Sequence, residues 1–322
     1  MLTIFGLEDE RLLPVGRIEA LPAGARAVWF DLVAPAPDED RRVEDLLGVS
    51  VPTREEMQEI EVSSRLYVEH GALYMTALVQ VGSETDEPTS SPITFILVGD
   101  RLATVRYDRP KSFDLYATRG ERGFEGLIDG RGVLMGLLEI IVDRLADSLE
   151  RTGGTIERIS ATVFRPRAER EKGLEEVITA IGRLGGTVGR TEECIVSLTR
   201  LFHYLGEENG AGRLDGPAKA RIVTLEADAR SLSDQAKSLD AKVNFLLSAT
   251  LGLVGLEQNT IVKIFSVLAV VFMPPTLIAS IYGMNFKAMP EIELPFGYPM
   301  ALGMMLASVA TTFAIFKWKR WL

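Results

Sequence analysis

The sequence predicts an α+β domain, arranged as an α/β/α sandwich, followed by long stalk helices and a two-helix transmembrane hairpin. Three observations support this fold class. Strand-like and helical segments alternate up to about residue 125, helical periodicity then continues without strands, and two long uncharged runs end the chain. The predicted segments are an α/β domain (1–125), a pair of long amphipathic helices (126–216), a stalk helix (217–263), two membrane helices (264–283 and 297–316), the loop between them (284–296) and a basic tail (317–322).

The composition excludes several classes of function. The 322 residues include one cysteine, Cys194, and two distant histidines, so neither a disulfide framework nor a zinc site built from Cys or His is expected. The formal net charge of -10 argues against a partner held through nucleic-acid phosphates. We find no nucleophile–base pair, phosphate-binding glycine loop or metal cluster, so we expect neither an enzyme nor an organic cofactor.

The first segment has the pattern of a sheet covered by helices. Strand composition occurs at 27–31, 66–69, 73–81, 93–98 and 102–107, and Gly99-Asp100 forms a two-residue turn between the last two. A helix is expected from Pro37, where an acidic run precedes apolar residues. Thr53 and Glu56 have the spacing of a capping box, in which each side chain satisfies a free backbone N–H of the other.

Helical periodicity dominates after residue 130. Two helices are predicted over 133–163 and 169–205, and Gly206 to Gly216 separates them from a third that starts near Pro217. This third helix carries a heptad seam, which packs either on copies of itself or on the two preceding helices. A continuous helix over 217–282 would be about 100 Å long. The seam residues are Leu225, Ala229, Leu232, Ala236, Leu239, Val243, Leu246, Thr250 and Leu253.

The two uncharged runs are 264–282 and 294–316. A helix of about 20 residues spans the ~30 Å hydrocarbon core of a bilayer, so the runs predict a hairpin in contact with lipid. The alternative is a pair of buried core helices. Lys263 precedes the first run, and the basic tail with Lys317 follows the second, so the positive-inside bias places both chain termini in the cytoplasm. Residues 261–322 carry a net charge of +3, and the rest of the chain carries -13.

Residues of the first run and just before it recur at three- and four-residue steps and share one helix face, which is polar at Asn259, Thr276 and Ser280 and otherwise mostly apolar. This face is a candidate pore lining if several copies assemble, and the alternative is ordinary packing of small polar residues between membrane helices. Pro274-Pro275 lies in the run and removes two backbone donors. The candidate pore-lining residues are Asn259, Val262, Phe265, Ala269, Met273, Thr276 and Ser280.

The residues that follow carry a family signature. Gly283-Met284-Asn285 ends the first membrane run, Met289-Pro290-Glu291 follows in the loop, and Phe272-Met273-Pro274-Pro275-Thr276 lies upstream. This arrangement resembles the CorA family of magnesium, cobalt and nickel transporters, and the C-terminal third is especially similar to the enterobacterial branch. Ile292 stands where that family usually has leucine.

The resemblance implies a homopentameric, funnel-shaped channel in the bacterial inner membrane that admits divalent cations and is gated by intracellular magnesium. Its ion-binding ring falls on Gly283, Met284 and Asn285. Its partners are then copies of itself, membrane lipid and the cations. Magnesium sheds water reluctantly, so a ring of neutral Asn285 amides suits the hydrated ion, which carboxylates would hold too tightly.

Other features are less specific. Glu291 is a candidate for concentrating cations at the outer mouth. Asp228, Asp234 and Asp240 on the stalk helix are candidates for regulatory metal ligands, and a solvated helix face is their alternative. A proton-coupled zinc transporter of the same superfamily is a competing hypothesis, although Met284 is retained here. A membrane-anchored scaffold or sensor that conducts nothing is another.

Overall fold

The computed structural model describes residues 1–322 apart from residues 17, 23, 60, 86, 124–127, 167–172, 208–215, 285–294 and 320–322. The chain divides into two compact units, Met1–Ser248 and Ala249–Leu322. The boundary between the units falls inside one helix, α7 (Gly216–Tyr282), which has 67 residues. One continuous helix over this range is what the sequence predicts.

The first unit holds all the described strands and most of the helices. The strands are β1 (Leu2–Glu8), β2 (Arg11–Val15), β3 (Arg26–Val33), β4 (Leu66–Glu69), β5 (Ala72–Val81), β6 (Thr89–Val98) and β7 (Arg101–Arg106). The helices are η1 (Ile18–Ala20), α1 (Pro37–Leu47), α2 (Arg54–Met57), α3 (Val62–Arg65), α4 (Lys111–Arg122), α5 (Gly130–Val163), α6 (Leu174–Gly206), α7 and, in the second unit, α8 (Gly297–Trp318).

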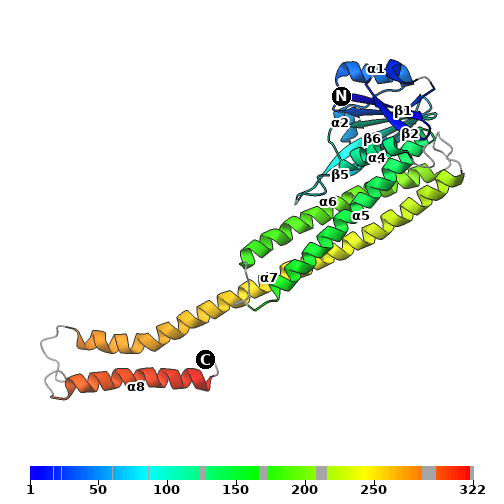
Figure 1. Cartoon of the computed structure of the whole chain (residues 1–322). Helices are drawn as coiled ribbons and strands as arrows, with labels where there is room; N and C mark the ends of the chain where they lie inside the picture. The colour runs from blue at the N-terminus through cyan, green and yellow to red at the C-terminus, as the bar shows by residue number, and fades with distance from the viewer. Residues whose placement is uncertain are drawn as a thin grey trace. The chain divides into compact units, whose positions relative to one another are not determined.

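The described strands form one mixed sheet in the order β2-β1-β3-β7-β6-β5-β4 (Figure 1). The central pair, β3 and β7, is parallel, and every other described pair is antiparallel. The predicted turn at Gly99-Asp100 connects β6 to β7, and the predicted capping box between Thr53 and Glu56 starts α2. Because β3 is central, both of its faces are buried.

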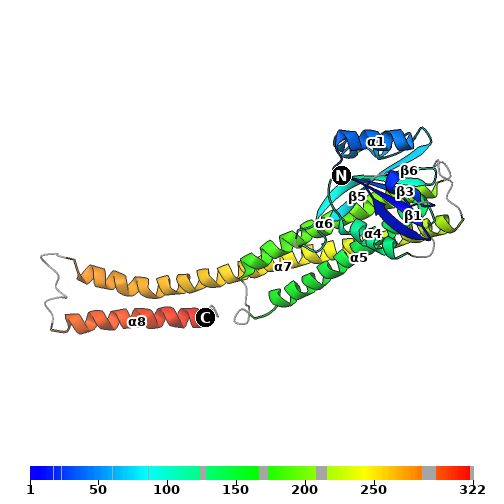
Figure 2. The same ribbon diagram turned by 45° about the horizontal axis from the view of Figure 1, so that its top comes forward.

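Helices cover both faces of this sheet, which confirms the α/β/α sandwich (Figure 2). On one face, Val43 of α1 and Met57 of α2 pack into a buried cluster with Phe30. On the other face, the Trp29 ring stacks on Phe5 at a centroid distance of 4.3 Å and meets Tyr116 of α4 edge-on at 5.8 Å. Each face therefore has its own apolar core, and β3 contributes alternate residues to both.

A buried ion pair joins the two parallel strands. Asp31 of β3 accepts bonds from Arg106 of β7 through both carboxylate oxygens, from Nε at 3.0 Å and from Nη2 at 2.8 Å. Thr104 donates to the same carboxylate at 2.8 Å and accepts from Trp29 Nε1 at 2.9 Å. The guanidinium also lies 4.6 Å from the centre of the Phe113 ring. Several partners thus compensate for the cost of burying these charges.

Several elements were not predicted from the sequence, namely the strands β1 and β2, the short helices η1 and α3, and the helix α4. The β1–β2 hairpin turns at Asp9 and Glu10, which have φ values of 47° and 58°. Non-glycine residues seldom adopt such values, and Asp-Glu is not a usual dipeptide for this turn. Helix α4, which begins after Pro110, was also missed. Part of the predicted start of the second long helix, at 169–172, lies outside the described residues, and α6 begins at Leu174.

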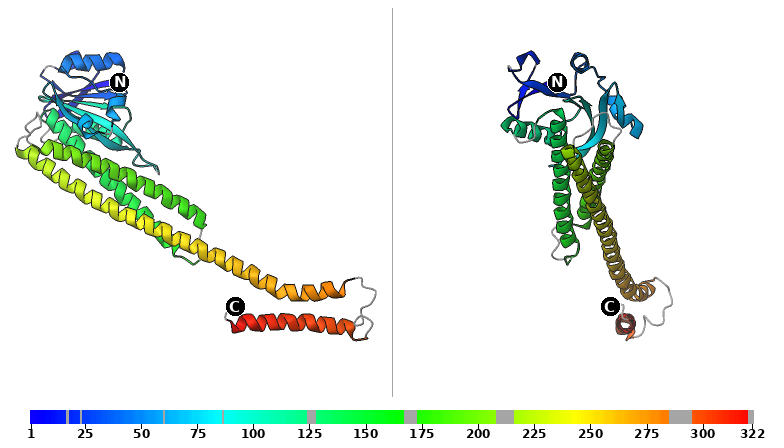
Figure 3. Two further views of the ribbon diagram at one scale, coloured as in Figure 1. Left: turned by 180° about the vertical axis from the view of Figure 1, so that it is seen from behind. Right: turned by 90° about the vertical axis from the view of Figure 1, so that its right-hand side faces the viewer.

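The heptad seam of α7 packs inside its own chain. Up to Thr250 its residues are buried, apart from the half-buried Leu232. Figure 3 shows the first part of α7 running beside α5 and α6. A Cβ on Gly153 of α5 would lie 3.5 Å from Leu239, and one on Gly185 of α6 would lie 3.4 Å from Val243. The seam therefore builds an intramolecular bundle with α5 and α6, which is one of the two alternatives that the sequence leaves open.

The buried pair gives a first test. We expect Arg106→Leu to lower the free energy of unfolding by about 3–5 kcal/mol, because the buried Asp31 carboxyl would lose the partner that compensates for its removal from water. The double variant Asp31→Leu/Arg106→Leu should lose less than the single variant, since it leaves no charge behind. Thermal unfolding of the full chain in detergent measures both. As a control, Lys237→Leu removes an exposed pair with Asp234 at 3.6 Å and should change the free energy by less than about 1 kcal/mol. Equal effects of the Arg106 and Lys237 variants would contradict the role of the buried pair.

Candidate functional site: an apolar helix hairpin with a polar face

Two helices of the described chain are long and apolar enough to cross a membrane. The best windows of α7 and α8 have mean hydropathies of 2.2 and 1.7. None of the α7 window and 11% of the α8 window is buried inside the chain. A core helix of a soluble protein buries its apolar side chains, so this exposure argues against the alternative of two core helices. Surfaces of this kind suit contact with lipid or with other copies of the chain.

The second unit shows which face of α7 is covered. Helix α8 runs antiparallel beside the last part of α7 in every view (Figures 1 to 3). The partly buried residues of α7 after Lys263 recur at the spacing of one helix face, as do the covered residues of α8. On α7 they are Val267, Val271, Pro274, Pro275, Ile278 and Tyr282. On α8 they are Gly297, Ala301, Met305, Ser308, Val309, Thr312 and Phe316.

The predicted pore residues lie on the other side of α7. All seven, from Asn259 to Ser280, are exposed in the single chain. At about 100° per residue, the centre of their arc lies roughly half a turn from the face covered by α8. The hydroxyl residues between Ile264 and Tyr282 are Ser266, Thr276 and Ser280, and all three fall within this arc. The hydroxyl groups on the uncovered side of α7 are therefore confined to one strip, whose other residues within the run are apolar.

The Thr276 hydroxyl can act only as an acceptor toward groups outside its own helix. It donates to the backbone carbonyl of Phe272 at 2.7 Å, one turn earlier. A hydroxyl has a single proton, so the bond to Phe272 leaves Thr276 Oγ1 with lone pairs only. The atom can thus accept a hydrogen bond from water or approach a cation. The helix continues through Pro274 and Pro275 although their missing N–H groups leave carbonyls of the preceding turn without an intrahelical donor.

The signature residues begin where α7 ends. The Gly283 N–H donates to the Ala279 carbonyl at 2.9 Å, and that of Met284 donates to the Ile281 carbonyl at 3.3 Å. The φ of Gly283 is not positive, so a left-handed backbone conformation is not what requires glycine here. A Cβ at this position would instead lie 3.1 Å from the Ala279 oxygen, so the requirement is space. Met284 is 49% exposed, while Asn285 and Glu291 lie outside the described residues.

The three stalk aspartates are exposed and do not converge. Asp234 pairs with Lys237 at 3.6 Å, and Asp240 accepts from Asn244 Nδ2 at 3.0 Å. Spacings of six residues put them on different sides of the helix. In the part of the chain that the structure describes, no three His, Cys, Asp or Glu residues form a group able to hold a metal ion.

Asp228 nevertheless has acidic neighbours from another helix. It lines a cleft of about 390 Å³ between α5 and α7, together with Glu139 and Asp143. Burial raises the pKa of Asp143, and the negative charges of Glu139, Asp147 and Asp228 raise it further. One cation already faces this cleft, because Arg221 pairs with Glu139 at 2.7 Å. Sequence spacing alone does not reveal the cluster, since Asp143 and Asp228 come from different helices.

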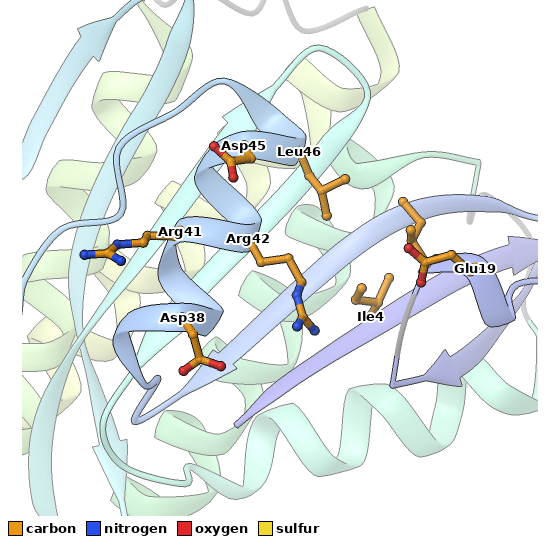
Figure 4. Close-up of a pocket in the computed structure, with 8 residues that line it drawn as sticks. Ile4, Glu19, Asp38, Arg41, Arg42, Asp45 and Leu46 are labelled. Atoms are coloured by element: carbon orange, nitrogen blue, oxygen red, sulfur yellow. The ribbon is translucent and has the colours of Figure 1, made fainter.

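A second cavity lies in the α/β domain and is unrelated to the hairpin. Its volume is about 650 Å³, and α1 forms one wall (Figure 4). Apolar residues such as Ile4 and Leu46 line it, with exposed charges of both signs, among them Asp38 and Arg42. Mixed exposed charges over a wide opening are typical of a solvated groove, so this cavity offers no selective place for a divalent cation.

Comparisons with known proteins agree with the resemblance. A family model described as "CorA-like Mg2+ transporter protein" matches residues 24–320. The Magnesium transport proteins CorA of Escherichia coli K12 and of Salmonella typhimurium LT2 are each 34% identical to this chain, over 100% of both sequences. The complete structure of the CorA magnesium transporter from Methanocaldococcus jannaschii has a TM-score of 0.76 at 19% identity and covers 100% of this chain and 99% of its own. The soluble domain of the same protein has a TM-score of 0.64 at 17% identity, over 79% of this chain and 97% of its own.

The acidic cleft gives a second test. The folded-state pKa of Asp143 is raised above its ordinary value of 3.8, so its charged form destabilises the native chain at neutral pH. We expect Asp143→Asn to raise the melting temperature at pH 7. The gain should shrink as the pH falls toward 4, where Asp143 takes up its proton. Asp234→Asn is the control, because that carboxylate is exposed and paired with Lys237. A gain that is the same at pH 7 and pH 4 would contradict the explanation.

Proposed function

This chain belongs to the family of CorA-like Mg²⁺ transporters, and we propose on that premise that it passes magnesium ions across a membrane. The observation that carries the proposal is the position of Gly283-Met284-Asn285 directly after the last residue of α7, next to the polar strip of that helix. The 34% identity to magnesium transport proteins over the full chain supports the same ion.

We further propose that α7 lines the pore of a homopentamer. Two membrane helices enclose no channel by themselves, so several copies must supply the wall. The face covered by α8 is unavailable for this purpose, and the strip from Asn259 to Ser280 is exposed. In the assembly Val262 and Phe265 form an apolar constriction near the cytoplasm, while Thr276 and Ser280 offer hydroxyl oxygens farther out. We propose that Asn285, which follows Met284 in the sequence, contributes to the ring of the five copies at the outer end of this pore.

Selectivity in this proposal comes from hydration. Magnesium prefers octahedral oxygen ligands and usually keeps several waters. Neutral Asn285 amide oxygens accept hydrogen bonds from those waters without holding the ion too tightly for release. Glu291 raises the local concentration of cations at the mouth. Cobalt and nickel ions, which have the same charge, are further proposed substrates. We place the protein in the bacterial inner membrane, with both chain termini in the cytoplasm.

The proposed gate responds to intracellular magnesium. A ligand that binds one conformation more tightly shifts the population toward that conformation. Acidic side chains of the cytoplasmic bundle, among them Asp228, Asp234 and Asp240, are the candidates to bind the ion between neighbouring subunits. Their exposure in the single chain leaves them accessible to such a neighbour.

Ion flux into liposomes tests the proposed activity. We expect the purified chain to admit magnesium without a proton gradient, and Asn285→Leu to abolish entry while the oligomer still assembles, because leucine cannot accept bonds from the ion's waters. Cobalt and zinc are measured in parallel, and chemical cross-linking checks assembly. Zinc entry that follows a proton gradient would favour the zinc branch instead. No flux from an assembled wild-type protein would favour a scaffold or sensor.

Thiol labelling tests the orientation of α7. The native Cys194 is buried and its pKa is raised to about 12, so it provides an unreactive background. We expect Thr276→Cys to react with a water-soluble methanethiosulfonate reagent in the membrane-embedded protein, because its face meets the aqueous pore. Ile278→Cys, two residues further on the covered face, is the matched control and should be protected. Faster reaction at position 278 than at position 276 would overturn the assignment of the pore face.

A further inference from the structure

Six buried side-chain polar atoms have no hydrogen-bond partner among the described residues, and three of them belong to residues that face one another. These three are Gln80 Oε1 on β5, Ser112 Oγ on α4 and Arg144 Nε on α5. Gln80 is 7% exposed and Ser112 is 3% exposed. A buried polar group without a hydrogen bond costs about 1–3 kcal/mol, so three together call for an explanation.

All three residues line one small cavity. Its volume is about 10 Å³, and Ser83 and Lys111 also contribute to its wall. That volume is close to the ~10–15 Å³ needed to hold a single water molecule. A water in such a site typically makes about three hydrogen bonds, which equals the number of unpartnered atoms here.

The orientation of the Gln80 amide follows from its other neighbour. Gln80 Nε2 lies 3.0 Å from Thr191 Oγ1 of α6. The Thr191 hydroxyl donates its only proton to the Thr187 carbonyl at 2.8 Å, so it can only accept from Gln80. The NH₂ group must therefore face Thr191, and the amide oxygen is left as the unpartnered acceptor. The positions of the amide oxygen and nitrogen, which electron density often leaves ambiguous, are thereby assigned.

We propose that one ordered water molecule occupies this cavity and bridges β5, α4 and α5. The water donates one hydrogen bond to Gln80 Oε1 and accepts one from Arg144 Nε–H. Its third hydrogen bond is with the Ser112 hydroxyl, which can act as donor or acceptor. An anion would face the Gln80 oxygen and the nearby Glu84 carboxylate, which already pairs with Lys111 at 2.6 Å and Arg144 at 3.2 Å. A cation would face the Arg144 guanidinium. A neutral molecule that both donates and accepts meets all three demands.

The bridge extends a polar network across the interface between the sheet and the helices. Arg144 also donates to Ser83 Oγ at 2.8 Å, and Gln80 continues the network to α6 through Thr191. The water thereby joins β5, α4 and α5, and the Gln80 amide extends the network to α6. Its role is structural and does not depend on the ion that the chain transports.

A density map of the full-length protein at a resolution that shows ordered waters decides the question. We expect a peak within about 2.7–3.2 Å of Gln80 Oε1, Ser112 Oγ and Arg144 Nε. No peak there, in a map that shows other buried waters, would overturn the proposal. So would an anomalous signal at the site after bromide replaces chloride, because it would identify an anion.

A double-mutant cycle gives an independent readout. Ser112→Ala and Gln80→Leu should each lower the melting temperature by about 2–4 °C, and the double variant should lose less than the sum because both residues bind one water. The control pairs Ser112→Ala with Thr152→Val. Thr152 lies two turns after Arg144, donates to the Ser148 carbonyl at 2.8 Å and does not line the cavity. Those effects should add, and additivity in both pairs would count against a shared water.

Discussion

The packing of the α7 seam against α5 and α6 is the constraint on which the rest of the chain depends. Apolar residues from Leu225 to Leu246 fill the contact, and glycines on the facing helices leave room for them: Leu239 lies opposite Gly153 and Val243 opposite Gly185. Because this seam is used within one chain, it is not available for self-association. Assembly must therefore use other surfaces, and the side of α7 beyond Ser248 that α8 leaves uncovered is exposed and largely apolar.

The kind of side chain that α7 exposes changes along its length. In the first unit most apolar residues of its seam are buried and most of its charges are exposed, as expected in water. Beyond Lys263 the pattern reverses: apolar side chains such as Phe265 and Met273 are 69% and 67% exposed, and no charged residue occurs until the helix ends. A bilayer accepts this pattern only if backbone groups stay bonded within the helix, and α7 satisfies that condition apart from the two prolines.

The sequence predicts the helical part of this protein much better than its sheet edges and its buried polar groups. Periodicity identifies the seam because seven-residue spacing is a local property, and length identifies the apolar helices for the same reason. The β1–β2 hairpin was missed because Asp9 and Glu10 adopt positive φ without a glycine. The Asp31–Arg106 pair and the cleft shared by Asp143 and Asp228 join residues far apart in sequence, which no spacing rule connects.

The candidate pore was found in two different ways. The polar arc of α7 follows from residue spacing, and its exposure in the structure agrees with that derivation. The role of Asn285 rests on the signature, because a single asparagine after a helix has no pattern of its own. The seam illustrates the opposite case: spacing showed that it packs on other helices but could not distinguish copies of the chain from α5 and α6. Only the three-dimensional contacts make that distinction.

The same local hydrogen bond occurs in the helical bundle of the first unit and on the proposed pore face of α7. Threonines in helices donate their proton to the carbonyl one turn earlier, as Thr191 does to Thr187 and Thr276 does to Phe272. Each hydroxyl then becomes a pure acceptor with a fixed direction. Inside the bundle, Thr191 accepts from the Gln80 amide and thereby orients it. On the exposed face of α7, the lone pairs of Thr276 meet no such donor in the described chain. The same local hydrogen bond thus orients a neighbouring amide inside the first unit and leaves an exposed neutral oxygen acceptor on α7, which is the property that the proposed pore requires.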